Sequence, residues 1–465
     1  MVHIFSHYVP GRLIFLVVLE AVVLLVSAQV AIALHFAGFG AALLDADAAL
    51  AKQAFPYALG MMAIMASFGL YQSDPSQDTT SSGSRIATAF LLGFAIIGLV
   101  SYLAPSHYPG LISLSATALT LALAGSLIVR AAFRKWSDLS AFKPRVLVLG
   151  TGSRVARLAD YARANPNHQV VGYVSLQPAK HYVPSRQVLP MAQGESLLSM
   201  AEKHAIDEIV VAVRNRRDGA LPLQQLLECK MNGVKVVELP TFFEREFRQV
   251  MLDSLNPSWM VLGDGFRQGL FRNSLKRLFD LTVSSVLLLL CLPVLLVTTL
   301  CICLESGLPV LYRQERVGLG RRVFTLYKLR SMKKDAERDG AVQWAKADDD
   351  RTTWVGRFIR KTRIDELPQI FNVLKGEMSF VGPRPERPFF VDQLVNQVPY
   401  YALRHSVKPG ITGWAQVRYA YGASVDDAIE KLQHDLYYVK NHSLFLDIMI
   451  LIATVEVVLW GKGAR

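Results

Sequence analysis

The sequence predicts a membrane protein of three parts: a helical bundle, a cytosolic α/β domain, and a C-terminal domain that begins with another long hydrophobic helix. Three observations support this fold class. The 465 residues are too many for one compact domain. The hydrophobic content of 52% exceeds that of an ordinary soluble enzyme. Between two hydrophobic regions, short β-branched runs alternate with helical segments, as they do around parallel sheets.

Four hydrophobic runs near the N-terminus each approach the ~20 residues that a helix needs to cross a bilayer. They cover residues 13–36, 55–71, 86–104 and 111–133. Because three more runs follow the first, we interpret it as a membrane helix and not as a cleaved secretory signal. Lys and Arg crowd the exit of the fourth run, and such residues favour the cytoplasmic side. We therefore expect a four-helix transmembrane bundle over residues 1–140.

The formal net charge of +12 at pH 7 does not by itself choose a partner. It would suit nucleic acid, but in a membrane protein Lys and Arg also gather near anionic lipid headgroups. The hydrophobic runs favour inner-membrane lipid as the partner, with no nucleic acid. The four cysteines show no metal-type or disulfide-type spacing, which predicts inert thiols in a reducing compartment.

Residues 145–262 are expected to form a small, doubly wound, Rossmann-like domain. Runs at 146–149, 170–174, 208–213 and 234–239 predict strands, with helices at 155–164, 195–204 and 221–231. The Gly-Thr-Gly-Ser turn at 150–153 suggests a dinucleotide site. Against this, Val155 replaces the third small residue, and the second strand ends at Ser175 without a ribose-binding acid. A scaffold or regulatory module is the favoured interpretation.

A second long hydrophobic run, residues 281–304, has basic residues on both sides. A spanning helix would leave one of these basic groups outside, against the usual bias. A re-entrant helix over 277–304, which enters the membrane and returns to the same face, fits better. Pro293 supplies the bend, because proline removes a backbone hydrogen bond and clashes with the preceding turn. The alternative is an ordinary kinked span.

Cationic motifs follow this helix, at residues 327–332 (Tyr-Lys-Leu-Arg-Ser-Met) and 356–361 (Gly-Arg-Phe-Ile-Arg-Lys). Arg and Lys suit phosphoryl transfer, because they neutralise the oxygens that carry charge in the transition state. A solvated basic face or a patch for anionic lipid is the alternative.

A pair of carboxylates, Asp365 and Glu366, lies within this cationic region. Neighbouring cations should keep both ionised, so that they can bind a metal or attack phosphorus. Further along, Pro383 and Pro385 bracket Arg384. The two prolines form a stiff turn that can aim the guanidinium at a diphosphate.

From about residue 275 to 463 the chain resembles the bacterial sugar transferase family of polyprenyl-phosphate phosphoglycosyl transferases. The matching motifs are Lys-Leu-Arg-Ser-Met at 328–332, Asp-Glu-Leu-Pro-Gln at 365–369, Gly-Pro-Arg-Pro at 382–385, Lys-Pro-Gly-Ile-Thr-Gly-Trp at 408–414 and Tyr-Tyr-Val-Lys at 437–440. The four spans and the degenerate α/β domain resemble the large subgroup that begins exopolysaccharide, capsule or O-antigen repeat units.

The resemblance implies a catalytic domain over residues 270–465 with a re-entrant membrane helix bent at Pro293. It implies that Asp365 is the nucleophile and contacts Mg²⁺, with Glu366 as its partner and Arg360 as a positioning cation. The expected substrate-binding residues are Lys328, Arg330, Pro383, Arg384 and Pro385. Where the family often has Ser-Pro at the bend, this chain has Leu292-Pro293, which leaves open how the broken backbone is satisfied.

The implied reaction transfers hexose-1-phosphate from a UDP-sugar to undecaprenyl phosphate and releases UMP through an aspartyl intermediate. UDP-glucose and UDP-galactose are the family's common donors. The implied place is the bacterial inner membrane, with the catalytic domain on the cytoplasmic face. A non-catalytic membrane scaffold or lipid-binding regulator is the alternative from another class, and direct glycosyl transfer, which releases UDP, is a third.

The hydrophobic run at 444–460 contains two acids, Asp447 and Glu456, and is therefore a poor candidate for a span. We expect a helix that lies on or near the membrane surface, with a buried core helix as the alternative. The sequence leaves open the sugar, the pathway, the role of the α/β domain and the oligomeric state. A homodimer through the bundle or the α/β domain is one candidate assembly.

Overall fold

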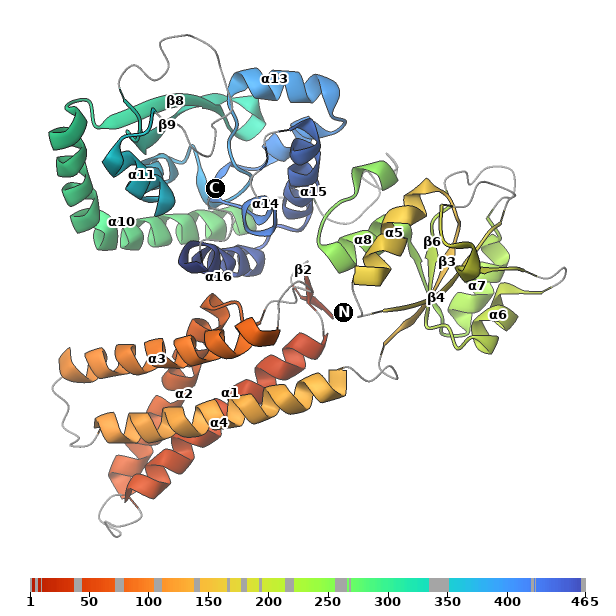
Figure 1. Cartoon of the computed structure of the whole chain (residues 1–465), viewed down its shortest axis with the longest axis horizontal. Helices are drawn as coiled ribbons and strands as arrows, with labels where there is room; N and C mark the ends of the chain where they lie inside the picture. The colour runs from red at the N-terminus through yellow and green to blue at the C-terminus, as the bar shows by residue number, and fades with distance from the viewer. Residues whose placement is uncertain are drawn as a thin grey trace. The chain divides into compact units, whose positions relative to one another are not determined.

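A computed structural model describes most of the chain (Figure 1). The described residues are 2–4, 7–9, 11–36, 44–71, 79–103, 111–137, 143–164, 168–176, 182–191, 195–213, 221–255, 266, 269–333, 351–419, 422 and 424–460. Contacts group nearly all of residues 8–247 into one compact unit and residues 248–465 into another. The three-part division expected from the sequence stays a prediction, and its borders at 140, 262 and 465 lie outside the described residues.

The N-terminal part of the chain forms two short strands, which the two units share, and four long helices of the first unit. The strands are β1 (Val2–Ile4) and β2 (His7–Val9), and the helices are α1 (Gly11–Phe36), α2 (Leu44–Ser67), α3 (Thr79–Leu103) and α4 (Leu111–Ser137). Each predicted hydrophobic run is helical, apart from residues 68–71, which form a turn after α2, and residue 104, which is not described. The helices share a core that includes Leu24, Met65 and Ala122.

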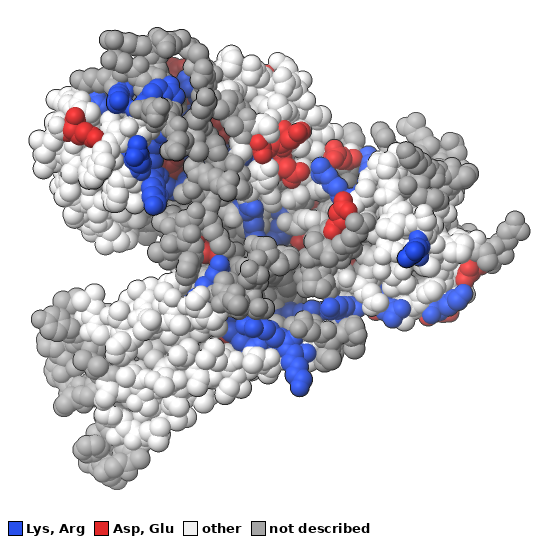
Figure 2. Space-filling model, in the orientation of Figure 1, with Lys and Arg blue, Asp and Glu red and all other residues white. Residues whose placement is uncertain are grey.

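Two of the four helices, α1 and α4, are long and apolar enough in the described residues to cross a membrane, over Gly11–His35 and Ser113–Trp136. The apolar stretches of α2 and α3 are shorter, at Ala54–Ser67 and Gly83–Leu99. The visible face of these helices is almost entirely white in Figure 2. A face without charges suits contact with lipid.

A buried ion pair joins α1 to α4. Arg130 Nε lies 2.6 Å from Glu20 Oε1, and its Nη2 lies 2.9 Å from Glu20 Oε2. The remaining nitrogen, Nη1, donates to the Leu70 carbonyl just after α2, at 3.2 Å. Each of the two side chains neutralises the other, which matters because an unpaired charge buried among apolar helices would cost free energy.

A five-stranded parallel sheet forms the rest of this unit, with strand order β5-β4-β3-β6-β7. The strands are β3 (Arg145–Leu149), β4 (Gln169–Val174), β5 (Val188–Leu189), β6 (Glu208–Val211) and β7 (Lys235–Glu238). The helices are α5 (Ser153–Ala164), α6 (Leu197–Lys203), α7 (Leu223–Met231) and α8 (Leu239–Phe247), with a 3₁₀ turn at Ser185–Gln187. A further 3₁₀ turn, Leu252–Ser254, belongs to the second unit. The four predicted strands and three predicted helices are confirmed to within a few residues, whereas β5 was not expected.

The glycine turn after β3 contains one residue that needs its glycine, since Gly150 has φ of +127°. Val155, in the first turn of α5, is fully buried. The carbonyl of Thr151 accepts a hydrogen bond from Tyr182 N at 2.9 Å. The Thr151 carbonyl of the turn is therefore already engaged by another segment of the chain.

The helices of the second unit begin with α10 (Leu270–Ser306), which is followed by the antiparallel hairpin of β8 (Leu311–Val317) and β9 (Val323–Leu329). The remaining helices are α11 (Trp354–Lys361), α12 (Gln369–Lys375), α13 (Pro388–Gln397), α14 (Trp414–Arg418), α15 (Val425–Asn441) and α16 (Leu444–Trp460). Short 3₁₀ helices lie at η5 (Leu319–Arg321), η6 (Ile364–Glu366) and η7 (Tyr401–Ser406). The strands β10 (Ser379–Val381) and β11 (Gly410–Thr412) pair with each other in parallel.

Helix α10 has 37 residues, contains Pro293, and is drawn in Figure 1 as two segments that meet at a sharp angle. A straight helix of this length would extend about 55 Å. Instead, both ends contact the same small unit. Near its start, Arg277 donates to the carbonyls of Val373 and Leu374 at 2.6 and 2.7 Å. Near its end, Ile302 packs in a core cluster with Leu329.

The C-terminal helix α16 turns its acids inward. Asp447 is 1% exposed, lies 2.9 Å from Lys276 Nζ of α10, and accepts a hydrogen bond from Tyr438 at 2.8 Å. Leu446 and Ile450 are fully buried. This burial favours the core-helix alternative over a helix that only lies on a surface.

The close approach of β10 and β11 can be tested at Gly382, where an added Cβ would overlap the backbone of Lys408. We expect Gly382→Ala to lower the Tm of the detergent-solubilised protein by several degrees, because overpacking costs about 1–3 kcal/mol. Gly269→Ala is the control, since no heavy atom lies within 4 Å of the position that its added methyl group would take. Equal Tm values for the two variants would contradict this packing.

Candidate functional site

The two carboxylates of the predicted dyad lie on η6, a tight turn between two helices. Arg363 precedes it with φ of +57°, a left-handed conformation that turns the chain after α11. Pro368 follows and begins α12, a position where its missing N–H costs nothing. Asp365 and Glu366 are each 8% exposed.

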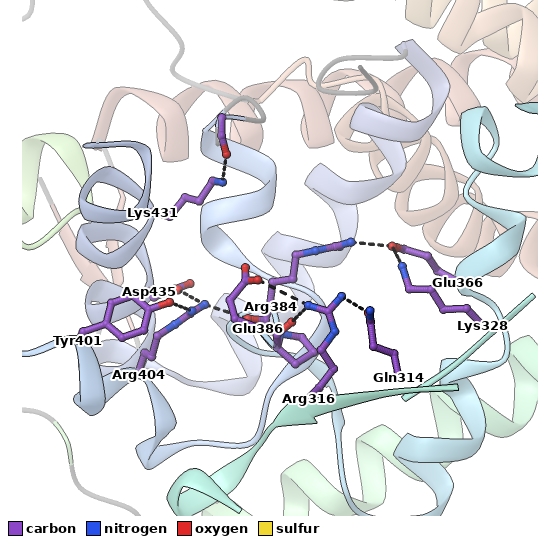
Figure 3. Close-up of polar contacts among 12 residues, drawn as sticks. Gln314, Arg316, Lys328, Glu366, Arg384, Glu386, Tyr401, Arg404, Lys431 and Asp435 are labelled. Atoms are coloured by element: carbon purple, nitrogen blue, oxygen red, sulfur yellow. Dashed lines mark hydrogen bonds and ion pairs between the residues drawn. The ribbon is translucent and has the colours of Figure 1, made fainter. Parts of the chain in front are cut away.

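Glu366 is bound by three cations. Its Oε1 lies 3.0 Å from Lys328 Nζ on β9 and 2.8 Å from Arg384 Nη2, as Figure 3 shows. Its Oε2 lies 3.8 Å from Arg363 Nη1. Burial alone would raise the pKa of Glu366, but Arg384, Lys328 and Arg363 together hold it well below its usual range. Glu366 is therefore a fixed anion.

Asp365 is buried to the same degree but makes no hydrogen bond or ion pair with any residue that the structure describes. Burial raises its pKa to about 6, and the adjacent Glu366 adds to the rise. Lys328, Arg384 and Arg360 offset part of the effect through their charges. The two neighbours thus differ: one carboxylate is committed to cations, and the other is available.

The side chain of Asn372, on α12, holds β9 and with it Lys328 beside the dyad. Asn372, fully buried, donates from Nδ2 to the Thr325 carbonyl at 2.7 Å and accepts from Tyr327 N at 3.2 Å. These bonds set the register of β9 against α12, and Lys328 is the next residue of the strand. Sequence reasoning had no signal for this role, since a single Asn in a helix is common.

Two other predicted cations, Arg360 and Arg330, do not bind Glu366 and make other contacts. Arg360 acts on Asp365 through its charge, while its Nη1 donates to Thr352 Oγ1 at 3.1 Å. Arg330 is 8% exposed and binds the end of α10, where its Nη2 donates to the hydroxyl of Ser306 at 2.8 Å and to the carbonyl of Gly307. The observed contact of Arg330 is with the end of α10, and its predicted binding of substrate stays a prediction.

Asp280 was missed by the sequence analysis, although an acid at the edge of a hydrophobic run is a visible signal. It is 2% exposed on α10. Its Oδ1 accepts hydrogen bonds from Ser379 Oγ at 3.0 Å and Phe380 N at 3.1 Å, and lies 3.1 Å from Lys276 Nζ. The network anchors α10 to β10, the strand that leads to the Arg384 loop.

The predicted magnesium ligand can be judged from the donors present. Mg²⁺ usually binds through one or two carboxylates together with substrate phosphates and waters. In the described parts of the chain, no three His, Cys, Asp or Glu side chains form a cluster. Asp365 has unpaired oxygens, whereas Glu366 is committed to Lys328 and Arg384, so Asp365 is the carboxylate that fits this mode of binding.

Lys and Arg side chains gather on the visible face of the second unit, in the region that contains α11 (Figure 2). The same unit holds an available carboxylate and a fixed one, together with a long apolar helix. This combination defines a site for anionic substrates, close to a helix that can enter a membrane.

Comparison with known proteins agrees with this site. A family model for bacterial sugar transferases matches residues 271–461. The UDP-glucose:undecaprenyl-phosphate glucose-1-phosphate transferase of Xanthomonas campestris pv. campestris is 33% identical over 335 residues, which cover 69% of this chain and 67% of that protein. The chain belongs to the bacterial sugar transferase family, which confirms the resemblance seen in the sequence.

Two further relatives match shorter stretches of the chain at higher identity. The UDP-N-acetylgalactosamine-undecaprenyl-phosphate N-acetylgalactosaminephosphotransferase of Aeromonas hydrophila is 44% identical over 240 residues, covering 52% of this chain and 56% of that protein. The UDP-glucose:undecaprenyl-phosphate glucose-1-phosphate transferase of Caulobacter vibrioides is 42% identical over 192 residues, or 41% of this chain and 71% of that protein. The chain thus spans little more than half the length of the Aeromonas relative.

The contrast between the two carboxylates predicts opposite effects on stability. The folded pKa of Asp365, about 6, exceeds its usual value of 3.8. The folded state therefore binds the proton more tightly, and stability falls as pH rises from about 3.8 to 6. At pH 7 without Mg²⁺, we expect Asp365→Asn to raise the Tm. Glu366→Gln should lower it, because it leaves Lys328 and Arg384 without their counter-ion.

Thermal unfolding of the two variants at pH 4 and pH 7 measures this contrast. The advantage of Asp365→Asn should shrink toward pH 4, where the unmutated carboxyl is protonated in the folded state. Two variants that destabilise equally at pH 7 would contradict the different environments of the carboxylates.

Proposed function

We propose that this chain transfers hexose-1-phosphate from a UDP-sugar to undecaprenyl phosphate, with release of UMP, through a phosphosugar bound covalently to Asp365. The observation that carries the proposal is the unpaired Asp365 carboxylate beside a Glu366 that is already neutralised by Lys328 and Arg384. The names of the relatives support the reaction class, since they pair UDP-sugars with undecaprenyl phosphate.

In the first step, an Asp365 oxygen attacks the β-phosphorus of the UDP-sugar. A bond forms between this oxygen and phosphorus, the bond from phosphorus to the α-phosphate oxygen breaks, and UMP leaves with the electron pair. In the second step, an oxygen of undecaprenyl phosphate attacks the same phosphorus, and the bond to Asp365 breaks. One anhydride replaces another, so the protein mainly positions the groups and neutralises charge.

The cations divide this work. Lys328 and Arg384 hold Glu366 ionised, and the Arg384 side chain is 38% exposed, so that a diphosphate can also reach it. Arg360 contributes positive charge near Asp365. A bound Mg²⁺, held by Asp365, would neutralise phosphate oxygens during transfer.

We further propose that α10 is re-entrant in the bacterial inner membrane, with the catalytic unit on the cytoplasmic face. The bend visible in Figure 1 and the contacts of both helix ends with one unit support this arrangement. Between these ends, Leu289, Leu290 and Leu296 are exposed, as expected for lipid contact. The α/β domain is proposed to be a Rossmann-like scaffold or regulatory module.

The nucleotide product separates the proposal from its rivals. Incubation of purified protein with Mg²⁺, undecaprenyl phosphate and each of UDP-glucose, UDP-galactose and UDP-N-acetylgalactosamine should release UMP with at least one donor. UDP as the product would indicate direct glycosyl transfer. No nucleotide release with any donor, from folded protein, would favour the scaffold or lipid-binding regulator.

The covalent intermediate has its own test. With sugar-labelled donor and no lipid acceptor, label should appear on the protein together with stoichiometric UMP. Asp365→Asn should abolish both, since an amide is a poor nucleophile. Glu366→Gln should slow turnover without preventing labelling. If rapid quenching finds no label on protein, and UMP appears only after acceptor is added, a direct displacement replaces the two-step reaction.

Pro293→Ala tests the topology. A continuous α10 of 37 residues exceeds the ~20 needed to span the ~30 Å core. We expect that, in part of the molecules of this variant, the catalytic unit lies on the periplasmic side. In a chain without its native cysteines, Leu319→Cys should react with an impermeant maleimide from outside only in the variant. Met231→Cys, on the α/β domain, is the control.

Leu319 and Met231 are both exposed, so labelling reports the side of the membrane and not burial. External labelling of Leu319→Cys without the proline substitution would refute re-entrance.

A further inference from the structure

The loop that carries Arg384 is held at four consecutive carbonyls. Gly410 N donates to the Pro383 carbonyl at 3.0 Å, and Val317 N donates to the Glu386 carbonyl at 3.0 Å. The two carbonyls between them, of Arg384 and Pro385, accept from arginine side chains. Arg404 Nη2 lies 2.9 Å from the Arg384 carbonyl, and Arg316 Nη1 lies 3.0 Å from the Pro385 carbonyl.

Arg404 is itself fixed more firmly than a surface side chain. It is 6% exposed on η7. Its Nη2 lies 2.8 Å from Asp435 Oδ2 on α15, and its Nη1 donates to the hydroxyl of Tyr401 at 2.7 Å. Asp435 is 2% exposed, so the pair is buried. Figure 3 shows the resulting chain of contacts from Asp435 through Arg404 to Arg384 and on to Glu366.

Within the described residues, neither Arg404 nor Asp435 makes a hydrogen bond or ion pair with the dyad, yet the loop backbone joins them to it. Pro383 and Pro385 lack N–H donors, so this part of the loop backbone depends on the donors that its carbonyls accept from, and Arg404 is the donor at the Arg384 carbonyl. A small shift of the Arg384 backbone would move its guanidinium away from Glu366. Misplacement by about 1 Å can cost on the order of 100-fold in rate.

We propose that Arg404, fixed by Asp435 and Tyr401, is a positioning residue that holds Arg384 against the dyad through the Arg384 backbone carbonyl. The buried ion pair thus serves the site and is not only a feature of the core. The kinetic consequences rest on the proposed function, whereas the ordering of the loop does not.

Loop order is measured by hydrogen exchange of detergent-solubilised protein, followed by mass spectrometry of peptides that cover residues 382–387. Arg404→Lys should increase exchange there several-fold, because one ammonium cannot reproduce the planar set of donors. Arg321→Met is the matched control: it removes an exposed arginine of the same unit, paired with Asp392 at 3.3 Å, and should leave the loop unchanged. Unchanged exchange in Arg404→Lys would overturn the proposal.

A second variant guards against misfolding. Arg404→Met alone would leave Asp435 as a buried, unpaired charge, but Arg404→Met/Asp435→Leu removes both charges. We expect this double variant to fold, to show the same loosened loop, and to lose on the order of 100-fold in kcat/KM. Full kcat/KM, with protected loop amides, would overturn the proposal.

A double-mutant cycle shows whether Arg404 acts through Arg384. Rates are counted per active site from the UMP burst, so that misfolded protein does not contribute. In an Arg384→Met background, the Arg404→Met/Asp435→Leu change should lower kcat/KM less than about twofold, and its split between kcat and KM should match that of Arg384→Met. Additive losses would refute positioning. If the unmutated chain shows no turnover, only the proposed function fails, and hydrogen exchange still decides the role of Arg404.

Discussion

The site depends on one electrostatic interaction, the binding of Glu366 by Lys328 and Arg384. The two cations come from β9 and from the loop after β10, so a single carboxylate joins the hairpin, η6 and the loop. Much of the surrounding structure serves to bring these three segments together. Asn372 holds β9 against α12, and Asp280 anchors α10 to β10. Buried arginines such as Arg404 bind the backbone of the loop that carries Arg384.

The neutralisation of Glu366 has a consequence for its neighbour. Two adjacent buried carboxylates repel each other, and burial disfavours the charged form of both. By committing its cations to Glu366, the protein leaves Asp365 without a partner among the described residues, a state that disfavours folding but suits a nucleophile or a metal ligand. The Arg384 side chain is partly exposed, so a second anion can also meet it, and one residue serves both the fold and the site.

Much of the architecture could be predicted from the sequence, because hydrophobic runs and β-branched runs encode helices and buried strands locally. The dyad was recognisable because Asp365-Glu366 is unusual within so cationic a segment. The role of Arg404 was not, since its acceptor is a backbone carbonyl 20 residues away, and any residue at that position offers a carbonyl. The strand β5 escaped because two residues carry no pattern, and the burial of α16 could not be foreseen because the sequence does not tell that Asp447 pairs with Lys276.

Two of the arginines illustrate how cationic charge is distributed between the fold and the solvent. Arg277 binds the carbonyls that end α12, and Arg330 binds the carbonyls that end α10. A helix C-terminus carries a partial charge of about −0.5, so each guanidinium is compensated in part by the helix end that it binds. The electrostatic potential that an approaching polyanion meets is therefore weaker than the formal charge of +12 suggests. Its dependence on ionic strength should reflect only the cations that remain uncompensated, such as those on the outer face of α11.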